Sequence, residues 1–130
     1  MKLITRNTDY ALRALCYMAK KKNIVSVDAL VEKLGVPRPF MRKILQQLNK
    51  KEVLESYKGQ GGGFKLKVPA RKIYLTRIMQ IFQGHVGLNG CFLKKEACPN
   101  RGACLLRKKI HSIEDNVLGE LRKINIASLI

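Results

Sequence analysis

The chain has 130 residues and a strongly basic composition, with 26 Lys and Arg against 9 Asp and Glu and a formal net charge of +17. This length fits one small domain with an appended element and excludes two independent domains of ordinary size. So large an excess of positive charge opposes compaction unless a polyanion neutralises it, so we expect nucleic acid as the partner. No apolar run approaches the roughly 18 residues of a membrane-spanning helix. We therefore expect a cytoplasmic protein that does not enter a membrane.

The first predicted helix covers residues 8–21. Its apolar positions recur at helical spacing: Tyr10, Ala11, Ala14, Leu15 and Met18. Thr8 is the expected N-cap, and Asp9 falls in the first turn, where the helix dipole favours an anion. Cys16 lies among the apolar residues, so we interpret it as a small core side chain and leave it out of any site.

Two further helices form a predicted helix-turn-helix. Ser26 caps the second helix, Gly35 ends it, and the third begins near Val36-Pro37-Arg38-Pro39. The apolar face of the third helix contains Met41, Ile44, Leu45 and Leu48. Other faces carry residues that can donate to phosphates, and in the case of Arg and Lys to guanine edges in a major groove: Arg38, Arg42, Lys43, Gln46 and Gln47. A solvated basic face on an ordinary core helix is the alternative.

A β-hairpin is predicted after the third helix. Residues 53–57 and 64–68 are the predicted strands, and apolar and polar residues alternate along the second of them. The turn between them has four glycines among residues 59–63. From position 38 to position 72 there are ten Lys and Arg but two acids. Because the basic residues concentrate where a winged helix touches DNA, we interpret the hairpin as the wing. A nucleotide phosphate loop is the alternative, but here a strand follows the glycines and the Walker pattern is absent.

The segment after a short predicted helix at 75–82 contains three of the four cysteines, Cys91, Cys98 and Cys104. A disulfide framework is a poor explanation, because three is an odd number and we recognise no secretory signal. The basic residues between these cysteines would offset anionic thiolates. The spacing therefore predicts a metal or iron–sulfur site with one ligand position left open, and zinc is the alternative occupant.

The last predicted helix carries a long apolar stripe: Leu106, Ile110, Ile113, Val117, Leu121 and Ile124. A stripe of about five turns on so small a protein favours a partner, although packing against the first helix is the alternative. The expected architecture is mainly α with a small β-hairpin, a winged helix-turn-helix plus a long dimerisation helix. We divide this single compact unit into a DNA-binding region at 1–74 and a cluster-binding loop with the dimerisation helix at 75–130.

Three stretches resemble the Rrf-type winged-helix regulators, a family that includes the iron–sulfur regulator IscR and the nitric-oxide-sensing repressor NsrR. The stretches are Thr8-Asp9-Tyr10-Ala11-Leu12-Arg13-Ala14-Leu15, then Ser56-Tyr57-Lys58-Gly59-Gln60-Gly61-Gly62-Gly63-Phe64, and the cysteine triplet. The resemblance implies that the third helix enters the major groove and the wing reaches the minor groove of double-stranded DNA. We assign these residues to DNA, although IscR-like members have a glutamate at the position of Arg42 and the family usually has an arginine at that of Lys58: Arg38, Pro39, Phe40, Arg42, Lys43, Lys58, Gln60 and Gly61.

The same resemblance implies an iron–sulfur cluster, 2Fe-2S or 4Fe-4S, bound by Cys91, Cys98 and Cys104. IscR-like members place a histidine three positions after the last cysteine, where this chain has Arg107. NsrR-like members use an aspartate near the start of the first helix of the partner subunit, and Asp9 matches that position. Asp9 is therefore the expected fourth ligand in a homodimer, while complementing its own helix is the alternative role. His111, His85 and water are the reserve ligands.

These features predict a transcriptional regulator whose DNA affinity depends on a cluster that senses nitric oxide, redox state or iron–sulfur status. We expect a repressor rather than an activator. Alternatives are a zinc-stabilised or thiol-responsive DNA-binding regulator and a basic RNA-binding protein. A thiol redox enzyme is disfavoured because the expected Cys-x-x-Cys pair is absent. We find no Ser-His-Asp, paired-carboxylate or P-loop constellation, so we do not expect an enzyme.

Overall fold

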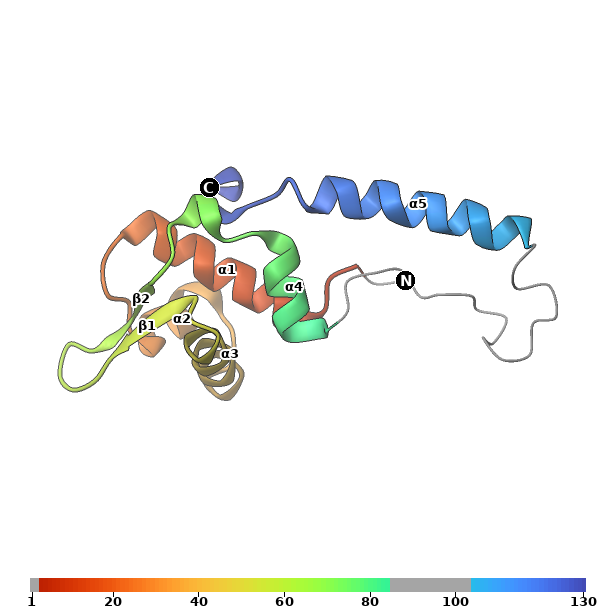
Figure 1. Cartoon of the computed structure of the whole chain (residues 1–130). Coiled ribbons are helices and arrows are strands. Elements are labelled where there is room, and N and C mark those ends of the chain that lie inside the picture. The colour runs from red at the N-terminus through yellow and green to blue at the C-terminus, as the bar shows by residue number, and fades with distance from the viewer. Residues whose placement is uncertain (1–2, 85–103) are drawn as a thin grey trace.

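In the computed structural model, which describes residues 3–84 and 104–130, a helical body is joined to a long helix that runs away from it (Figure 1). The expected fold class, mainly α with a small β-hairpin, is confirmed. The elements are α1 (Arg6–Lys21), α2 (Val27–Leu34), α3 (Arg38–Lys50), β1 (Leu54–Tyr57), β2 (Gly63–Leu66), the 3-10 helix η1 (Ala70–Lys72), α4 (Leu75–Gln83), α5 (Leu105–Leu121) and the 3-10 helix η2 (Ile126–Leu129).

Helix α1 lies at the centre of the body, where Ala11, Ala14 and Leu15 are completely buried. The helix begins before the predicted start, because Thr5 is its N-cap and accepts a hydrogen bond from the backbone N of Thr8 at 3.4 Å. The prediction of Thr8 as N-cap is therefore wrong. Thr8 is instead a buried residue inside the first turn, where its hydroxyl takes part in a contact with a distant helix.

The helix-turn-helix forms as predicted because its local signals agree with the tertiary packing. The Ser26 Oγ accepts a hydrogen bond from the backbone N of Ala29 at 3.1 Å, and Gly35 ends α2 in the left-handed conformation with φ 66°. Helix α3 starts directly after Pro37. Its apolar face is buried against α1 and α2, so the opposite face is left to solvent.

The wing consists of β1 and β2 paired antiparallel, with Leu54 opposite Leu66 and Tyr57 opposite Gly63. Both strands are shorter than predicted. A third segment extends the pair: the backbone N of Val25 donates to the Phe64 carbonyl, the Phe64 N donates to the Val25 carbonyl, and both distances are 2.8 Å. Because Val25 lies next to Ser26, the N-cap of α2, these bonds fix the wing relative to the helix-turn-helix.

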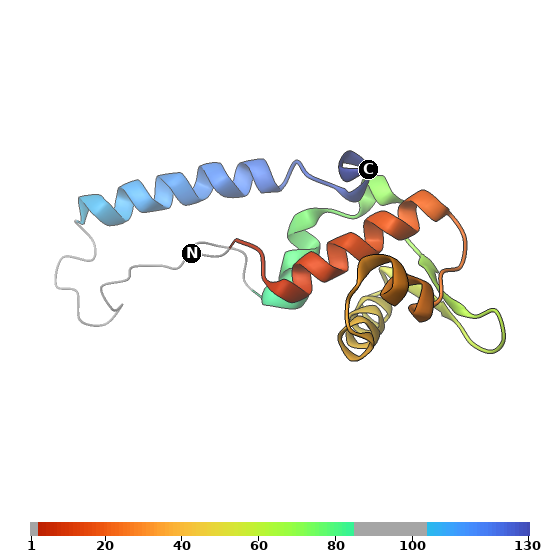
Figure 2. The ribbon, with the colours of Figure 1, turned by 180° about the vertical axis from the view of Figure 1, so that it is seen from behind.

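The chain returns to the body after α5. The backbone N of Leu75 donates to the Ile124 carbonyl at 3.0 Å, and the N of Ile126 donates to the Ile73 carbonyl at 2.9 Å. Ile126 is completely buried, and η2 packs on α1. Figure 2 shows this C-terminal segment beside η1 and the end of α1. The return therefore anchors the C-terminal end of α5 to the body.

Helix α5 itself remains exposed, and no side chain on it is buried. Leu106 keeps 48% and Ile113 keeps 51% of its surface accessible. The helix ends at Leu121, so Ile124 of the predicted stripe lies beyond it. Figures 1 and 2 both show α5 extending away from α1, so packing on the chain's own first helix does not cover the stripe. No helix in the described part of the chain is long and apolar enough to span a membrane.

Candidate DNA-binding surface and cluster site

The exposed side of α3 presents the residues that the sequence assigned to DNA. Pro39, Arg42, Lys43 and Gln46 recur at steps of three and four residues, so they form one row along the helix, and all four are exposed. The buried residues on the other side fix the direction in which this row points. An exposed row of cations and polar groups on the second helix of a helix-turn-helix is the arrangement that enters a major groove.

The start of α3 adds a second feature that suits a nucleic acid. Its N-cap is Pro37, and no side chain caps the first turn. The backbone N–H groups of Arg38 and Phe40 therefore remain without an intrahelical acceptor at the positive end of the helix dipole, where phosphates bind readily. Phe40 is 45% exposed at this same end. The N-terminal turn of α3 thus offers phosphate donors beside an apolar side chain.

Arg38 differs from the other cations of α3 because it already has a partner. Its guanidinium forms an ion pair with Asp28 in the first turn of α2. Both side chains are more than half exposed, so the pair contributes little stability. It does orient Arg38 and offsets part of its charge, whereas Arg42 and Lys43 have no acidic partner among the described residues. Arg42 and Lys43 are therefore more available to DNA than Arg38 is.

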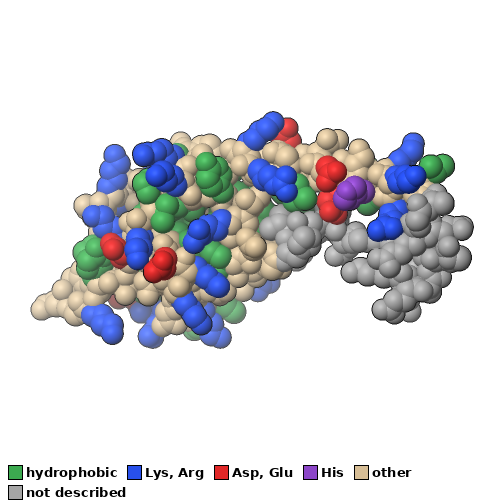
Figure 3. Space-filling view, viewed as in Figure 1, with side chains coloured by type: hydrophobic (Ala, Val, Ile, Leu, Met, Phe, Trp, Pro, Cys, Tyr) green, Lys and Arg blue, Asp and Glu red, His purple; other side chains and the backbone are tan. Residues whose placement is uncertain are grey.

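The turn of the wing carries Lys58, Gln60 and Gly61, all of which are exposed. Gly59 and Gly61 adopt φ values of 89° and 77°, a conformation that residues with side chains rarely adopt. Lys65 is also exposed, while Lys67 lies 3.6 Å from the Glu52 carboxylate. On the face shown in Figure 3, Lys and Arg are spread over the body with few acids between them. The wing and α3 thus place positive charge on neighbouring elements.

Two wing glycines are required by the protein itself. A Cβ on Gly63 would lie 2.3 Å from the Val25 carbonyl oxygen, and a Cβ on Gly62 would lie 2.2 Å from the Tyr57 carbonyl oxygen. These glycines are needed because another part of the chain's own backbone lies close to each of them. Nearby, the Tyr57 hydroxyl donates to Glu55 at 3.1 Å, and this hydrogen bond and the carboxylate charge raise the pKa of Tyr57.

The structure describes only part of the predicted cluster site. Cys91, Cys98 and the reserve ligand His85 lie outside the described residues. Cys104 is partly exposed and occupies the N-cap position of α5 without a side-chain hydrogen bond. Its sulfur lies at the positive end of a 17-residue helix, which would complement an anionic cluster. Within residues 3–84 and 104–130, no three His, Cys, Asp or Glu side chains converge on one point.

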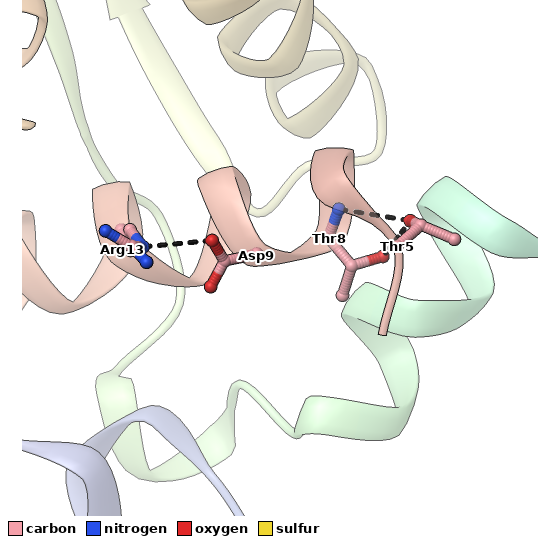
Figure 4. Close-up of polar contacts among 4 residues, drawn as sticks. All are labelled: Thr5, Thr8, Asp9 and Arg13. Carbon is pink, nitrogen blue, oxygen red and sulfur yellow. Dashed lines mark hydrogen bonds and ion pairs between the residues drawn. The ribbon is translucent and has the colours of Figure 1, made fainter. Parts of the chain in front are cut away.

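Asp9 lies in the first turn of α1, on the side of the helix that also carries Arg13 (Figure 4). Its Oδ2 is 3.0 Å from the Arg13 Nε, and 45% of the Asp9 side chain is accessible. The carboxylate is therefore held by a neighbour on its own helix and still open to a ligand from outside. The reserve ligand His111 is exposed on α5, with Nε2 3.7 Å from the Asp115 carboxylate.

Cys16 differs from Cys104 in its surroundings. It packs partly buried against the core, and burial raises the pKa of its thiol while the charge of Lys20 acts in the opposite direction. A thiol that is harder to ionise is a poor metal ligand. These surroundings favour the interpretation of Cys16 as a core side chain.

Helix α4 connects the cysteine segment to the other elements of the site through side-chain amides. Gln83, the last residue of α4, accepts from the Thr8 hydroxyl at 2.7 Å and from the Thr5 backbone N at 3.0 Å. Its Nε2 donates to the Leu3 carbonyl at 3.0 Å. These bonds fasten the end of α4 to the start of α1, one residue before Asp9. None of the three contacts was predicted, because their partners are more than 70 residues apart.

Two more hydrogen bonds fasten α4 to α3. The Gln47 Nε2 donates to the Ile81 carbonyl at 3.0 Å, and an Arg77 Nη2 donates to the Lys51 carbonyl at 3.0 Å. Lys51, Arg77, Gln80 and Ile81 line a shallow pocket between the two helices. Helix α4 therefore packs mainly on α1 and is joined to the C-terminal part of α3 by these two hydrogen bonds.

A family model named Rrf2, described as an iron-dependent transcriptional regulator, matches residues 4–130. The chain belongs to the Rrf2 family. The recognition made from the three stretches of sequence is thus confirmed, while the closer likeness to NsrR stays a prediction. As an Rrf2 protein, the chain is a DNA-binding transcriptional regulator.

Known proteins support this assignment. A protein of Aquifex aeolicus (strain VF5), described as an HTH-type transcriptional regulator, is 29% identical over 124 residues, which cover 93% of this chain and 86% of that protein. Among solved structures, CymR, the global cysteine regulator of B. subtilis, has a TM-score of 0.83 at 18% identity, with 99% of this chain and 96% of that chain covered. IscR of T. potens has a TM-score of 0.77 at 18% identity, covering 99% and 85% of the two chains. The two structures share the fold, and both CymR and the Aquifex aeolicus protein are described as regulators.

Proposed function

We propose that this Rrf2 protein is a homodimeric repressor whose affinity for a DNA operator is set by an iron–sulfur cluster. Cys91, Cys98 and Cys104 of one subunit would hold the cluster together with Asp9 of the other. The two described ligands suit this role: Cys104 is a partly exposed thiol at a helix N-terminus, and Asp9 is a partly exposed carboxylate. The family description as iron-dependent regulators supports the choice of iron. A regulator of transcription acts where the genome is, which supports a cytoplasmic location.

The observation that carries the proposal is the position of Gln83. It ends the helix that leads into the cysteine segment, and it is hydrogen-bonded to the first turn of α1 beside Asp9. The same helix is bonded to α3 through Gln47 and Arg77. A structural change in the cysteine segment would therefore reach, through α4, both the start of α1 and the helix that faces DNA.

The chain's own residues explain how such a site could respond to a signal. When bound, a cluster supplies iron that reacts with small oxidants and nitric oxide. A carboxylate is a weaker iron ligand than a thiolate, so Asp9 would leave one position open to exchange. Without a bond to iron, the Asp9 carboxylate would pair only with Arg13 on its own helix, and the start of α1 would no longer be tied to the partner subunit. The hydrogen bonds of Gln83 and Gln47 would pass this change to α3.

A thiol-based response is the second candidate. It is favoured by the structural likeness to CymR, which includes a S. aureus structure described as an oxidized form, with a TM-score of 0.78 at 21% identity. In that case the cysteines near α5 would change DNA affinity by oxidation, with no metal. A zinc site would use the same thiolates and would be colourless.

Anaerobic purification followed by visible absorption and by iron, sulfide and zinc assays tests the cofactor. A brown protein with iron and acid-labile sulfide supports the proposal, and a colourless protein without them that responds to oxidants supports the thiol-based alternative. DNA affinity is then measured with and without the cluster on a site selected from a random duplex library. Cys98→Ser should abolish both cluster and response, whereas the matched control Cys16→Ser should keep both. An unchanged cluster in Cys98→Ser would overturn the ligand assignment.

A further inference from the structure

Helix α3 carries two adjacent glutamines, Gln46 and Gln47, whose surroundings differ. Both are exposed, and their identical amides can each donate and accept hydrogen bonds. From the sequence they are interchangeable as DNA contacts. The structure separates them. Gln46 is four residues after Arg42 and three after Lys43, so it lies between them on the helix face, whereas Gln47 lies five residues after Arg42 and is bonded to α4.

Gln47 is already engaged within the protein. Its Nε2 donates to the Ile81 carbonyl at 3.0 Å. Ile81 lies in the last turn of α4, where carbonyl groups have no intrahelical donor, so the Gln47 amide satisfies a group that would otherwise need water. We therefore treat Gln47 as a positioning residue that ties α3 to α4.

Gln46 makes no hydrogen bond with any described residue and has no acidic neighbour on α3. It continues the row of Pro39, Arg42 and Lys43 at steps of three and four residues. Residues spaced in this way on one helix face reach successive base pairs in a major groove. Arg42 and Lys43 in the same row carry the positive charge that draws the helix onto the duplex.

We propose that Gln46 reads an adenine in the major groove and so determines part of the operator sequence. A glutamine amide presents one acceptor and one donor side by side, which match the N6 donor and N7 acceptor of adenine. No other base presents that pair in the major groove. The proposal rests on the DNA-binding function and adds the base class that one residue selects.

The test compares three proteins: the parent, Gln46→Ala and Gln47→Ala. Alanine is a good helix former, so neither change should disturb α3 itself. Selection from a random duplex library gives each protein's preferred site. We expect one adenine position per half-site to become unspecified in Gln46→Ala. Affinity for the parent's site should fall roughly 5- to 160-fold, the range of a bidentate base contact. Gln47→Ala should keep every base preference and lower the thermal midpoint instead.

A base analogue makes the test specific. Replacing that adenine by 7-deazaadenine removes the N7 acceptor, so it should weaken binding of the parent and leave binding of Gln46→Ala unchanged. Equal losses in both proteins, or an unaltered selected site in Gln46→Ala, would overturn the proposal. A parent protein that selects no site at all would instead contradict sequence-specific DNA binding, so the two failures are distinguishable.

Discussion

Asp9 and Arg13 illustrate how one residue can have both a structural and a functional role. Their ion pair joins positions i and i+4 of α1, and both side chains are about half exposed. Exposed pairs of this kind are worth about 0.3–0.5 kcal/mol, so the pair alone gives little reason for an aspartate at this position. The carboxylate also complements the helix N-terminus, which adds about 0.3–1 kcal/mol. A role as cluster ligand would be far more sensitive to substitution than either of these.

Replacing Asp9 by Ala should therefore leave the apo protein folded, with its stability reduced by about 0.6–1.5 kcal/mol, the sum of the two contributions. The same change should shift the visible spectrum of the holoprotein, shorten the lifetime of its cluster and weaken the effect of the cluster on DNA binding. Thermal melting of the apo form and stopped-flow exposure to nitric oxide measure the two parts separately.

The matched control is Arg13→Ala, which removes the ion pair but keeps the carboxylate. It should destabilise the apo protein by about 0.3–0.5 kcal/mol, less than Asp9→Ala does, because the helix N-terminus keeps its carboxylate. It should also keep the parent's spectrum. If the two variants share one spectrum and one cluster lifetime, the ion pair and not a bond to iron explains the effect, and His111, His85 or water becomes the fourth ligand.

At the scale of elements, the wing is fixed more firmly than a two-stranded hairpin usually is. An isolated hairpin is marginal in water, but here Val25 pairs with Phe64 on the outer side of β2. The close approach that makes this pairing possible depends on Gly63. The turn carrying Lys58 is thus held at a defined position relative to α3, so that both can contact one duplex.

Lys58→Ala tests the wing. If Lys58 binds a phosphate, its removal should weaken binding to all sequences alike and reduce the slope of log K against log salt by about 0.9 for each phosphate that Lys58 neutralises. Base preference should not change. Fluorescence anisotropy at several salt concentrations gives the slope, and competition with unrelated duplexes gives the preference.

Lys123→Ala provides the control, because it removes the same charge from the segment after α5. It should leave the slope close to that of the parent. A Lys58→Ala variant that also keeps the parent's affinity at every salt concentration would remove the wing from the DNA-binding surface.

The whole molecule combines a basic body with an uncovered apolar helix. At +17 per chain, two subunits repel each other, so a dimer requires substantial apolar contact. Helix α5 provides the surface for it: Leu106 and Ile113 are each about half exposed, and no described element covers them. We propose that α5 packs against α5 of a second subunit, which would also bring each Asp9 toward the partner's cysteines.

Ile113→Lys should break this dimer, because an unpaired charge at the interface costs several kcal/mol. Sedimentation velocity should show a monomer, and cluster retention should fall with it. His111→Lys is the control, since it adds a charge on the opposite side of α5 and should remain dimeric. A folded Ile113→Lys protein of undiminished mass would exclude this interface.

Much of the element order was predictable from the sequence because its signals are local. Ser26 and Gly35 mark the two ends of α2, and the apolar periodicity of α3 determines which of its faces is buried. The glycine-rich turn and the alternating strands likewise predict the hairpin. The candidate DNA residues on α3 and the wing follow from the same signals, since exposed positions are those left over when the apolar face is buried.

Only the tertiary structure decided which of these side chains are free to act. Thr8 resembles a helix cap in sequence but is buried and bonded to Gln83, 75 residues away. Gln47 resembles Gln46 until α4 provides the Ile81 carbonyl that engages it. The sequence gives no reason for a glycine at position 63, but in the structure the Val25 backbone lies so close that a side chain there would clash with it. Each role depends on atoms that are distant in the chain and meet only when it folds, so no local pattern could reveal them.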